Sequence, residues 1–292
     1  MTTSIPFADE LLAASWPPEV RSLSATAVKL YLKCPEDFRR QRIQREDTTP
    51  GVAMVWGSAH HRAAEHNFKA KINSGEDLPT PEVLDRFVSA VDEEVQDRGG
   101  KSSIDWTMSK KAVSLDDVKR RGLDAVQAYH EGPVKTIIPV AAEKRFSLRI
   151  AGVPVPVNGF IDVETKYRVR DLKLSGRAKT KLDPEWALQG GLYALQTGKP
   201  ASFDLVTFDG RLHLPADDEV HGRLPFTVAY SMTSAAAIED LILMVAHGIA
   251  HNYATYGPDD SWPGAITHPW ACGYCSFSGD CRWYRSIVAQ GG

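Results

Sequence analysis

The sequence predicts an α/β protein in which a mixed sheet is flanked by helices, with a helical N-terminal part and a cysteine-rich tail. In residues 52–72, 81–98 and 113–131, apolar side chains recur every three to four positions, which is typical of amphipathic helices. Residues 134–150 and 153–175 are rich in Val, Ile and Phe and alternate with a period of two, as strands do. This order of elements indicates one compact α/β unit.

Local signals define several of the other elements. Ser22 or Ser24 can cap a helix that leads up to Cys34-Pro35. Asp183 is a suitable cap for a helix over Pro184–Gln196, because proline is favoured at the first helical position. The remaining expected elements are strands over 202–208 and 224–230 and a helix over 234–256.

The bulk composition is that of a globular chain. At 292 residues the protein can bury a substantial core, and 43% hydrophobic with 24% charged residues is ordinary for a soluble protein. The first residues lack a basic start followed by an apolar run, so we expect no secretory signal. The longest apolar stretch, Leu241–Ala250, is too short to span a bilayer. We therefore expect a cytoplasmic protein that has no membrane partner.

The net charge of −3 does not by itself indicate nucleic-acid binding, but a local basic surface is enough to hold phosphates. Two basic clusters occur, and a solvated face is the ordinary explanation of such a run. The first comprises Lys33, Arg39, Arg40, Arg42 and Arg45. The second comprises Lys166, Arg168, Arg170, Lys173, Arg177, Lys179 and Lys181.

Two carboxylates and a lysine are expected to meet on one hairpin. Its short strands flank a turn at Lys166-Tyr167, and a turn centred there places Asp162 opposite Asp171. Opposed residues on antiparallel strands project to the same face, so the two carboxylates would converge. Lys173 follows Asp171 by two positions and lies on that face as well.

This group has the chemistry of a metal site. Neighbouring carboxylates repel each other unless a cation lies between them, and hard oxygen ligands suit Mg²⁺ or Mn²⁺. Such an ion can activate water against a phosphate, and Lys173 can orient that water. The acid-x-Lys spacing is weak evidence alone, because Asp117/Lys119 and Glu164/Lys166 share it. A charged surface hairpin is the alternative.

Four short elements occur in a recognisable order: Gly57-Ser-Ala-His-His61, Gly159-Phe-Ile-Asp162, Asp171-Leu-Lys173 and Gln189-Gly-Gly-Leu-Tyr193. In these elements the chain resembles the RecB-like nucleases of the PD-(D/E)xK superfamily. The resemblance spans roughly residues 22–285 and implies a restriction-endonuclease-like core. It also implies that DNA is the substrate.

The resemblance implies roles for individual residues. The implied metal ligands are His61, Asp162, Asp171 and the backbone carbonyl of Leu172. Lys173 would assist the attacking water, and Gln189 and Tyr193, which share a helix face, would contact DNA or support the lysine. His60 adjoins His61, and helical register alone allows either to bind metal. The family's spacing favours His61.

The chain has four cysteines: Cys34, Cys272, Cys275 and Cys281. Disulfides are not expected without an export signal, and a structural zinc site usually takes two close pairs. One cysteine far before three others resembles the iron–sulfur branch of this superfamily, which includes the CRISPR-associated four-cysteine exonucleases and the AddB nuclease domain. The resemblance implies a 4Fe–4S cluster. Zinc or buried thiols remain the alternatives.

The sequence therefore leads us to expect a DNA exonuclease that uses Mg²⁺ or Mn²⁺ on single strands or duplex ends. No P-loop is present, so a helicase or recombination partner would be a separate protein. Recombination, repair or phage DNA metabolism is the expected setting. A catalytically silent DNA-binding subunit and a zinc-stapled endonuclease are the alternatives. We expect a single nuclease unit made of a helical part over 22–131, a core over 132–256 and a tail over 257–292 that packs with Cys34. Trp270 and Phe277 would shield the cluster from water, and packing in the core is an equal alternative for both.

Overall fold

The computed structural model describes residues 12–108, 111–175, 182–207, 212–213, 227–228, 232–264, 272 and 275–288. The chain divides into two compact units. We call the first the terminal unit; it contains Met1–Thr48, Phe146–Gly159 and Met232–Gly292. We call the second the sheet unit; it contains Thr49–Arg145 and Phe160–Ser231. The expected organisation as a single nuclease unit stays a prediction.

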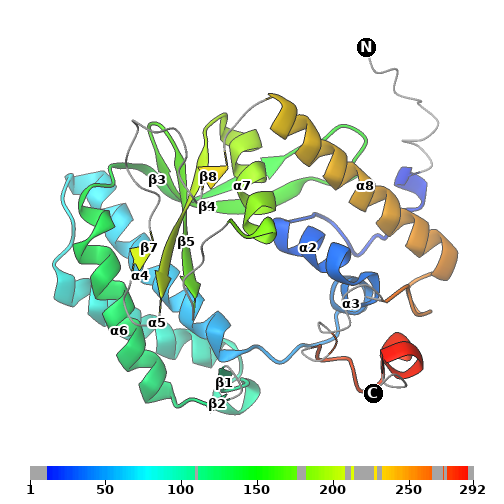
Figure 1. Ribbon diagram of the computed structural model, residues 1–292, viewed down its shortest axis with the longest axis horizontal. Coiled ribbons are helices and arrows are strands. Elements are labelled where there is room, and N and C mark those ends of the chain that lie inside the picture. Colours follow the sequence, from blue (N-terminus) through cyan, green and yellow to red (C-terminus); the bar gives the residue numbers. More distant parts are fainter. Residues whose placement is uncertain are drawn as a thin grey trace. The chain divides into compact units, whose positions relative to one another are not determined.

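Three helices of the sheet unit, α4 (Val52–Ser74), α5 (Thr80–Asp97) and α6 (Leu115–Glu131), lie side by side (Figure 1). Helix α4 ends at Gly75, whose φ of 81° is a left-handed conformation that favours glycine. Helix α6 begins with a capping box between Ser114 and Asp117. The three predicted helices are confirmed. Their shared core comprises Val52, Val55, Trp56, Ala59, Ala63, Val83, Phe87, Ala90, Val91, Val95, Ile104, Val118 and Val126.

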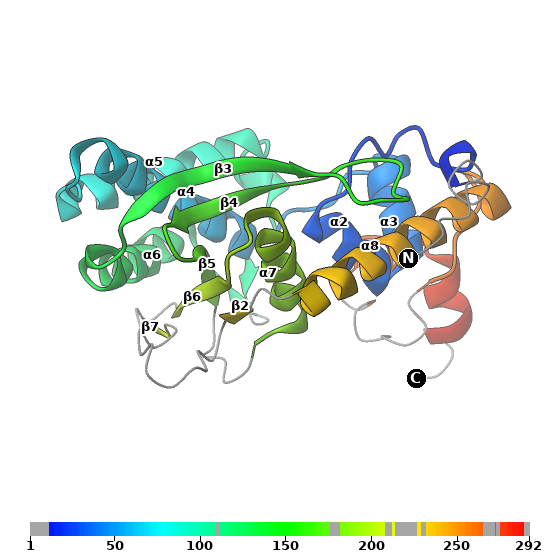
Figure 2. The ribbon, with the colours of Figure 1, turned by 90° about the horizontal axis from the view of Figure 1, so that it is seen from above.

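A six-stranded mixed sheet has the order β3-β4-β5-β6-β7, with β8 also paired to β6. Strands β4 and β5 are antiparallel, whereas β5 and β6 are parallel. Helix α7 (Pro184–Thr197) connects the parallel pair and is capped by Asp183, as predicted. Figure 2 shows the long strands β3 and β4 side by side. The bounds are β3 (Pro139–Leu148), β4 (Val157–Thr165), β5 (Val169–Ser175), β6 (Ala201–Thr207), β7 (Leu212–His213) and β8 (Thr227–Val228).

The β4–β5 hairpin has the predicted register. Val163 pairs with Arg170 and Glu164 pairs with Val169. The Thr165 hydroxyl donates to the carbonyl of Arg168 (2.9 Å), and the backbone N–H of Thr165 donates to the same oxygen, which closes the loop. The register therefore sends the side chains of the two central aspartates to one face, as the alternation along each strand requires.

A buried ion pair supports the other face of β5. The Arg170 guanidinium donates to both carboxylate oxygens of Asp204 on β6, at 2.9 and 2.7 Å. The Tyr129 hydroxyl of α6 donates to the same carboxylate at 2.9 Å. Bidentate pairs of this kind are geometrically specific, so this contact fixes β5 against β6. Arg170 thus belongs to the core and not to a solvated basic face.

In the terminal unit, α2 (Ala25–Lys33) begins at the predicted cap Ser24 and is followed by α3 (Pro35–Phe38), the π-helix η1 (Arg39–Ile43) and later α8 (Met232–Tyr256). Helices α2 and α8 are in contact. A Cβ atom at Gly248 would lie 2.5 Å from the Tyr31 hydroxyl, so this close approach needs glycine. The remaining elements are η2 (Lys101–Ser103), β1 (Thr107–Met108), β2 (Lys111–Ala112), η3 (Pro133–Lys135) and η4 (Tyr284–Val288).

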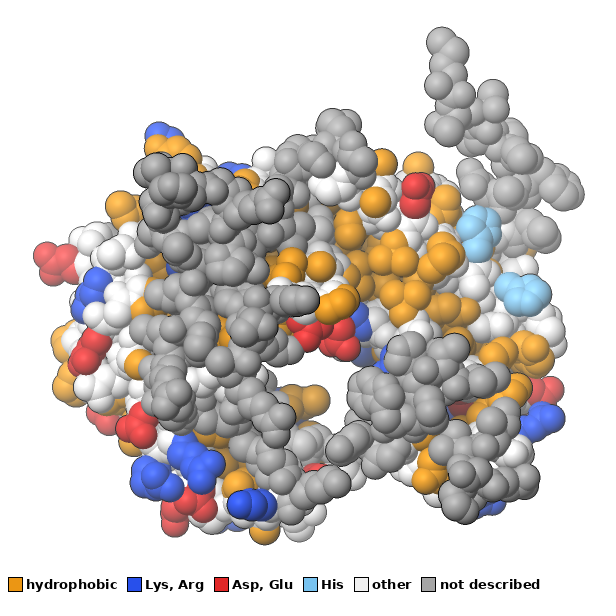
Figure 3. Space-filling model, viewed as in Figure 1, with side chains coloured by type: hydrophobic (Ala, Val, Ile, Leu, Met, Phe, Trp, Pro, Cys, Tyr) orange, Lys and Arg blue, Asp and Glu red, His pale blue; other side chains and the backbone are white. Residues whose placement is uncertain are grey.

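Helix α8 is longer than the apolar stretch seen in the sequence. Over Ser234–Tyr256 the helix is long and apolar enough to cross a membrane, judged by length and composition only. Ile242 and Ile249 are fully buried in the protein's core. The exposed face carries His247 and His251, and Figure 3 shows histidine side chains over this helix. Core packing in the terminal unit accounts for the apolar side of α8.

Candidate metal and catalytic site

Three elements of the sheet unit bring metal-type ligands together. His61 lies on α4, Glu143 on β3 and Asp162 on β4, and one ligand atom from each lies within 4.8 Å of the others. The His61 Nδ1 atom is 3.2 Å from Asp162 Oδ2. The backbone N–H of Leu172 donates to the same oxygen at 2.9 Å. The structure therefore brings the His61 ring close to the Asp162 carboxylate.

Glu143 was not among the residues predicted from sequence. Its backbone has a φ of 48°, which is unusual for a residue other than glycine and interrupts the regular alternation of β3. Strained residues of this kind concentrate at functional sites. A signal was present in the sequence, because Glu143 is the only acid between Glu131 and Asp162. Alternation alone could not show that this acid faces Asp162.

A second group of side chains forms a closed ring beside the first. The Lys173 Nζ atom lies 2.6 Å from Asp171 Oδ2 and donates to Gln189 Oε1 at 2.8 Å. Gln189 Nε2 donates to the Tyr193 hydroxyl at 2.6 Å, and that hydroxyl donates to Asp171 Oδ1 at 3.1 Å. Asp171 thus contacts the lysine and the tyrosine and does not belong to the 4.8 Å ligand group. The ring holds Lys173 in one place.

Burial and neighbouring charges shift the pKa values of the carboxyl groups and of the histidine in the site. Burial, reinforced by the charge of Asp162, raises the pKa of Asp171 to about 6 and that of Glu143 to about 7. Burial alone would lower the pKa of His61, but the Asp162 carboxylate outweighs it and raises the pKa to about 9. Burial likewise opposes ionisation of Asp162, yet the nearby His61 holds the pKa of that carboxyl below its usual range. A cation close to Asp162 is therefore favoured.

The neighbouring histidine has a different environment. His60 is only 1% exposed, and its ring meets the edge of Tyr129 at 6.0 Å between centroids. Burial lowers the pKa of His60 to about 3, so it is a neutral core residue. Helical register alone left His60 and His61 open as ligands. The structure brings His61 to the carboxylates.

The other two acid-x-Lys triplets have structural partners. Asp117 caps α6 through the Ser114 side chain and backbone. Glu164 accepts from Lys144 and Lys199, at 2.8 and 2.7 Å. Neither acid is part of the ligand group found among the described residues. Only the third triplet has its lysine beside a second carboxylate across the hairpin.

The two motif glycines differ in their surroundings. A Cβ atom at Gly159 would lie 2.6 Å from the Phe146 ring, so packing alone excludes a side chain there. A Cβ atom at Gly57 would meet no described atom within 4 Å. Gly57 lies one helical turn before His61 and leaves that surface of α4 open.

All four cysteines lie in the terminal unit and are partly exposed. The Cys34 Sγ atom accepts from the Asp37 backbone N–H at 3.5 Å, at the start of α3. Burial raises the pKa values of Cys272 and Cys275, and the charge of Cys281 raises both further.

Of the two residues expected to shield the cluster, the structure describes Phe277. Phe277 is buried, and the Arg40 guanidinium lies 4.2 Å from the centre of its ring. Trp270 lies outside the described residues, as do Arg177, Lys179 and Lys181 of the second basic cluster.

Comparison with known proteins identifies the family of the chain. The sequence profile described as "PD-(D/E)XK nuclease superfamily" matches residues 22–282. No curated protein is similar enough in sequence to match. Among solved structures, the crystal structure of SSO0001 is similar at 15% sequence identity with a TM-score of 0.33, over 81% of this chain and 87% of that chain. Because the profile covers most of its length, the chain belongs to the PD-(D/E)XK nuclease superfamily.

Proposed function

We propose that the protein is a divalent-metal-dependent deoxyribonuclease that degrades DNA as an exonuclease, from single strands or duplex ends. Membership of the nuclease superfamily, whose members use divalent metals, supports hydrolysis of phosphodiester bonds. One observation carries the proposal. His61, Glu143 and Asp162 offer ligand atoms within 4.8 Å of one another, beside a lysine that is held by an ion pair with Asp171 and a hydrogen bond to Gln189.

The ligand group fits a divalent cation. An imidazole nitrogen and carboxylate oxygens suit Mg²⁺ or Mn²⁺, and the raised pKa values of Glu143 and Asp171 reflect negative charge that a cation would offset. We assign His61, Asp162, Asp171 and the carbonyl of Leu172 as ligands and add Glu143. When bound, the ion supplies a Lewis acid for the phosphate and lowers the pKa of a coordinated water.

Lys173 is the proposed catalytic residue of the chain itself. In hydrolysis a water oxygen bonds to phosphorus, the bond to one bridging oxygen breaks, and that oxygen takes up a proton. The Lys173 ammonium, held at 2.6 Å from Asp171 and 2.8 Å from Gln189, can orient the water and offset charge that develops on the phosphate. Gln189 and Tyr193 are positioning residues, because they act through Asp171 and Lys173.

We also propose that Cys34, Cys272, Cys275 and Cys281 bind a 4Fe–4S cluster. A zinc tetrahedron with bonds of about 2.3 Å would place its sulfur atoms about 3.8 Å apart. Within the described part of the chain, no set of three or more cysteines has its sulfur atoms within 4.8 Å. A four-iron cluster holds each thiolate on a separate iron atom, so it suits sulfur atoms that lie farther apart than those of a zinc site. Closing so long a loop would stabilise the terminal unit.

The test of catalysis is digestion of end-labelled DNA in Mn²⁺ by purified wild-type protein and by Asp171→Ala and Lys173→Met. Lys119→Met is the matched control, because Lys119 belongs to an acid-x-Lys triplet that contacts Asp92 and not the site. We expect digestion by wild type and by the control, and loss of activity in the other two while circular dichroism shows a retained fold. Wild type that stays inert across metals and substrates would instead indicate a catalytically silent DNA-binding subunit.

The exonuclease mode and the biological setting need separate tests. Linear and covalently closed circular DNA, offered in parallel, distinguish attack at ends from internal cleavage. An exonuclease degrades only the linear substrate, whereas an endonuclease opens the circle. We propose that a separate helicase or recombination protein presents the DNA in recombination, repair or phage DNA metabolism. Co-purification from the native host, followed by digestion in the presence of the partner, tests that assignment.

A further inference from the structure

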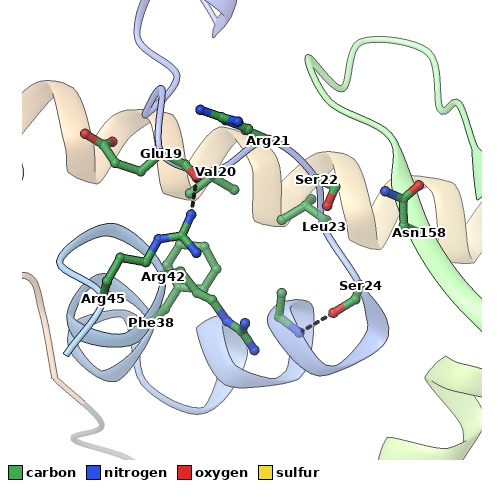
Figure 4. Close-up of a pocket in the computed structure, with 11 residues that line it drawn as sticks. Glu19, Val20, Arg21, Ser22, Leu23, Ser24, Phe38, Arg42, Arg45 and Asn158 are labelled. Atoms are coloured by element: carbon green, nitrogen blue, oxygen red, sulfur yellow. Dashed lines mark hydrogen bonds between the residues drawn. The ribbon is translucent and has the colours of Figure 1, made fainter. Parts of the chain in front are cut away.

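The terminal unit contains a polar cavity of about 210 Å³ that includes none of the metal-site residues. Figure 4 draws residues that line it: Arg21 lies on the segment before α2, Arg42 and Arg45 lie on η1 and the residues that follow it, and Asn158 lies on β4. The volume is roughly seven times the share of one molecule in liquid water, about 30 Å³. It has room for a small polar group with part of the molecule that carries it.

The arginines of this cavity differ from their neighbours in sequence. Arg39 is bound bidentately by Glu36 at 2.8 and 2.7 Å. Arg40 is bound by Glu46 and by Asp280. In the part of the chain that the structure describes, Arg21, Arg42 and Arg45 form no ion pair within 4 Å. Cationic side chains around a cavity without a carboxylate partner favour an anionic ligand.

Buried polar atoms in the same cavity lack a protein partner. Among the described residues, Arg42 Nε and Asn158 Oδ1 have no hydrogen-bond partner, although each atom is shielded from solvent. Glu19 Oε2 is also buried without a hydrogen-bond partner among the described residues. Figure 4 shows the Glu19 side chain directed away from Arg42. A buried unsatisfied donor is costly, and a ligand oxygen at Arg42 Nε would satisfy it. Burial lowers the pKa of Arg42, and the charge of Arg45 lowers it further, so an anion would be stabilised here.

The backbone around the cavity is held in an unusual conformation. Arg45 has a φ of 60°, in the left-handed region, and its guanidinium donates to the Glu19 carbonyl at 2.8 Å. Residues Arg39–Ile43 before it form a π-helix, a conformation that often marks functional sites. This arrangement keeps Arg42 and Arg45 on the cavity wall while Arg39 and Arg40 face carboxylates.

We propose that this cavity is a second ligand site, which binds a phosphomonoester group. Three arginines against one glutamate give the wall a charge of +2, which matches the charge of about −1.5 to −2 on a phosphomonoester near neutral pH. The guanidinium fork is the side-chain group best suited to phosphate oxygens. The carrier is a free nucleotide or the phosphorylated end of a nucleic acid strand. The choice of a nucleotide carrier rests on the proposed function, whereas phosphate binding itself does not.

Titration calorimetry of the full chain in EDTA tests the site without any catalysis. The probes are inorganic phosphate, deoxyadenosine monophosphate, deoxyadenosine, and one oligonucleotide with and without a terminal phosphate. We expect the monophosphate to bind about tenfold or more tightly than the nucleoside, which one charge-assisted hydrogen bond is enough to produce. Preference for the phosphorylated oligonucleotide assigns the strand end as carrier, and equal binding of the two oligonucleotides assigns the free nucleotide.

Variants locate the binding in this cavity. Arg42→Gln and Arg45→Gln should each remove the preference for the phosphorylated probe. Arg149→Gln removes the same charge from an exposed position of the same unit outside the cavity and should keep it. Arg45 is exposed, so its variant keeps the test open if Arg42→Gln fails to fold. Absence of any phosphate preference, or a preference that survives both variants, overturns the proposal. Nuclease activity, measured separately in Mn²⁺, reports on the proposed function alone.

Discussion

Replacing Glu143 by glutamine should raise the stability of the metal-free protein and weaken metal binding at the same time. Burial and the charge of Asp162 raise the pKa of Glu143 from its usual 4.5 to about 7. In the unfolded chain the carboxyl group is ionised above about pH 4.5. At pH 8 folding therefore places an ionised carboxylate in a site that disfavours the charge. This penalty is complete above pH 7 and disappears below about pH 4.5.

The magnitude follows from the difference between the two pKa values. An interval from 4.5 to about 7 corresponds to at most about 3.4 kcal/mol at 1.36 kcal/mol per pKa unit. Glu143 is partly exposed, so solvent screening reduces the expected gain of Glu143→Gln to about 1–2 kcal/mol at pH 8. At pH 4 the variant and the wild type should be equally stable. Losing the Glu143 carboxylate should weaken Mn²⁺ binding by about 10–100-fold, the effect typical of removing a residue that supports a metal ligand.

Urea denaturation in EDTA at pH 8 and pH 4 measures the first effect, and calorimetric titration with Mn²⁺ measures the second. Glu131→Gln is the control, because Glu131 is exposed at the end of α6 and its side chain contacts Gln127. A metal ligand should show higher stability without metal together with weaker Mn²⁺ binding when it is replaced. A carboxylate with only a structural role should instead lose stability. A Glu143→Gln protein that is less stable than wild type at pH 8, or that binds Mn²⁺ as wild type does, would show that Glu143 is not a metal ligand in a site that disfavours its charge.

Three further changes have defined outcomes. Tyr193→Phe removes the hydroxyl that contacts Asp171 and Gln189, and should lower kcat about tenfold with little change in Mn²⁺ affinity in a steady-state digestion assay; a normal kcat would contradict its positioning role. Asp77→Asn leaves the buried Lys71 ammonium without its carboxylate at 3.1 Å and should cost about 3–5 kcal/mol in urea denaturation. Burial raises the pKa of Asp77, but hydrogen bonds from neighbouring side chains outweigh burial and lower it. The stability of the wild type should therefore fall as the pH drops below about 4. An Asp77→Asn protein that loses as much stability in acid as the wild type would contradict this. Cys281→Ser should lose iron and the absorption near 400 nm after anaerobic purification, and a colourless wild type with stoichiometric zinc would contradict the cluster.

Much of the site could be predicted because its signals are local. The polar turn after Asp162 and the alternation of both strands fix the register that brings Asp171 across the hairpin. The spacing of four between Gln189 and Tyr193 places them on one face of α7, where both join the ring around Lys173.

The rest depends on tertiary contacts that spacing does not encode. Glu143 reaches Asp162 from a neighbouring strand, through a backbone conformation that breaks the alternation of β3. Arg39 and Arg42 look equivalent in the sequence, yet a carboxylate binds the first while the second faces a cavity. The grouping of the first, middle and last segments into one unit is likewise a property of the fold and of no local pattern.

In the proposed metal site, one divalent ion is held between His61 and Asp162. Crystals of the protein grown or soaked in Mn²⁺ and measured near the manganese absorption edge test it directly. We expect an anomalous peak about 2.0–2.6 Å from a His61 ring nitrogen and an Asp162 carboxylate oxygen, absent from Asp162→Asn crystals. Well-ordered crystals in saturating Mn²⁺ that show no peak at these side chains would mean that His61 and Asp162 do not bind the ion.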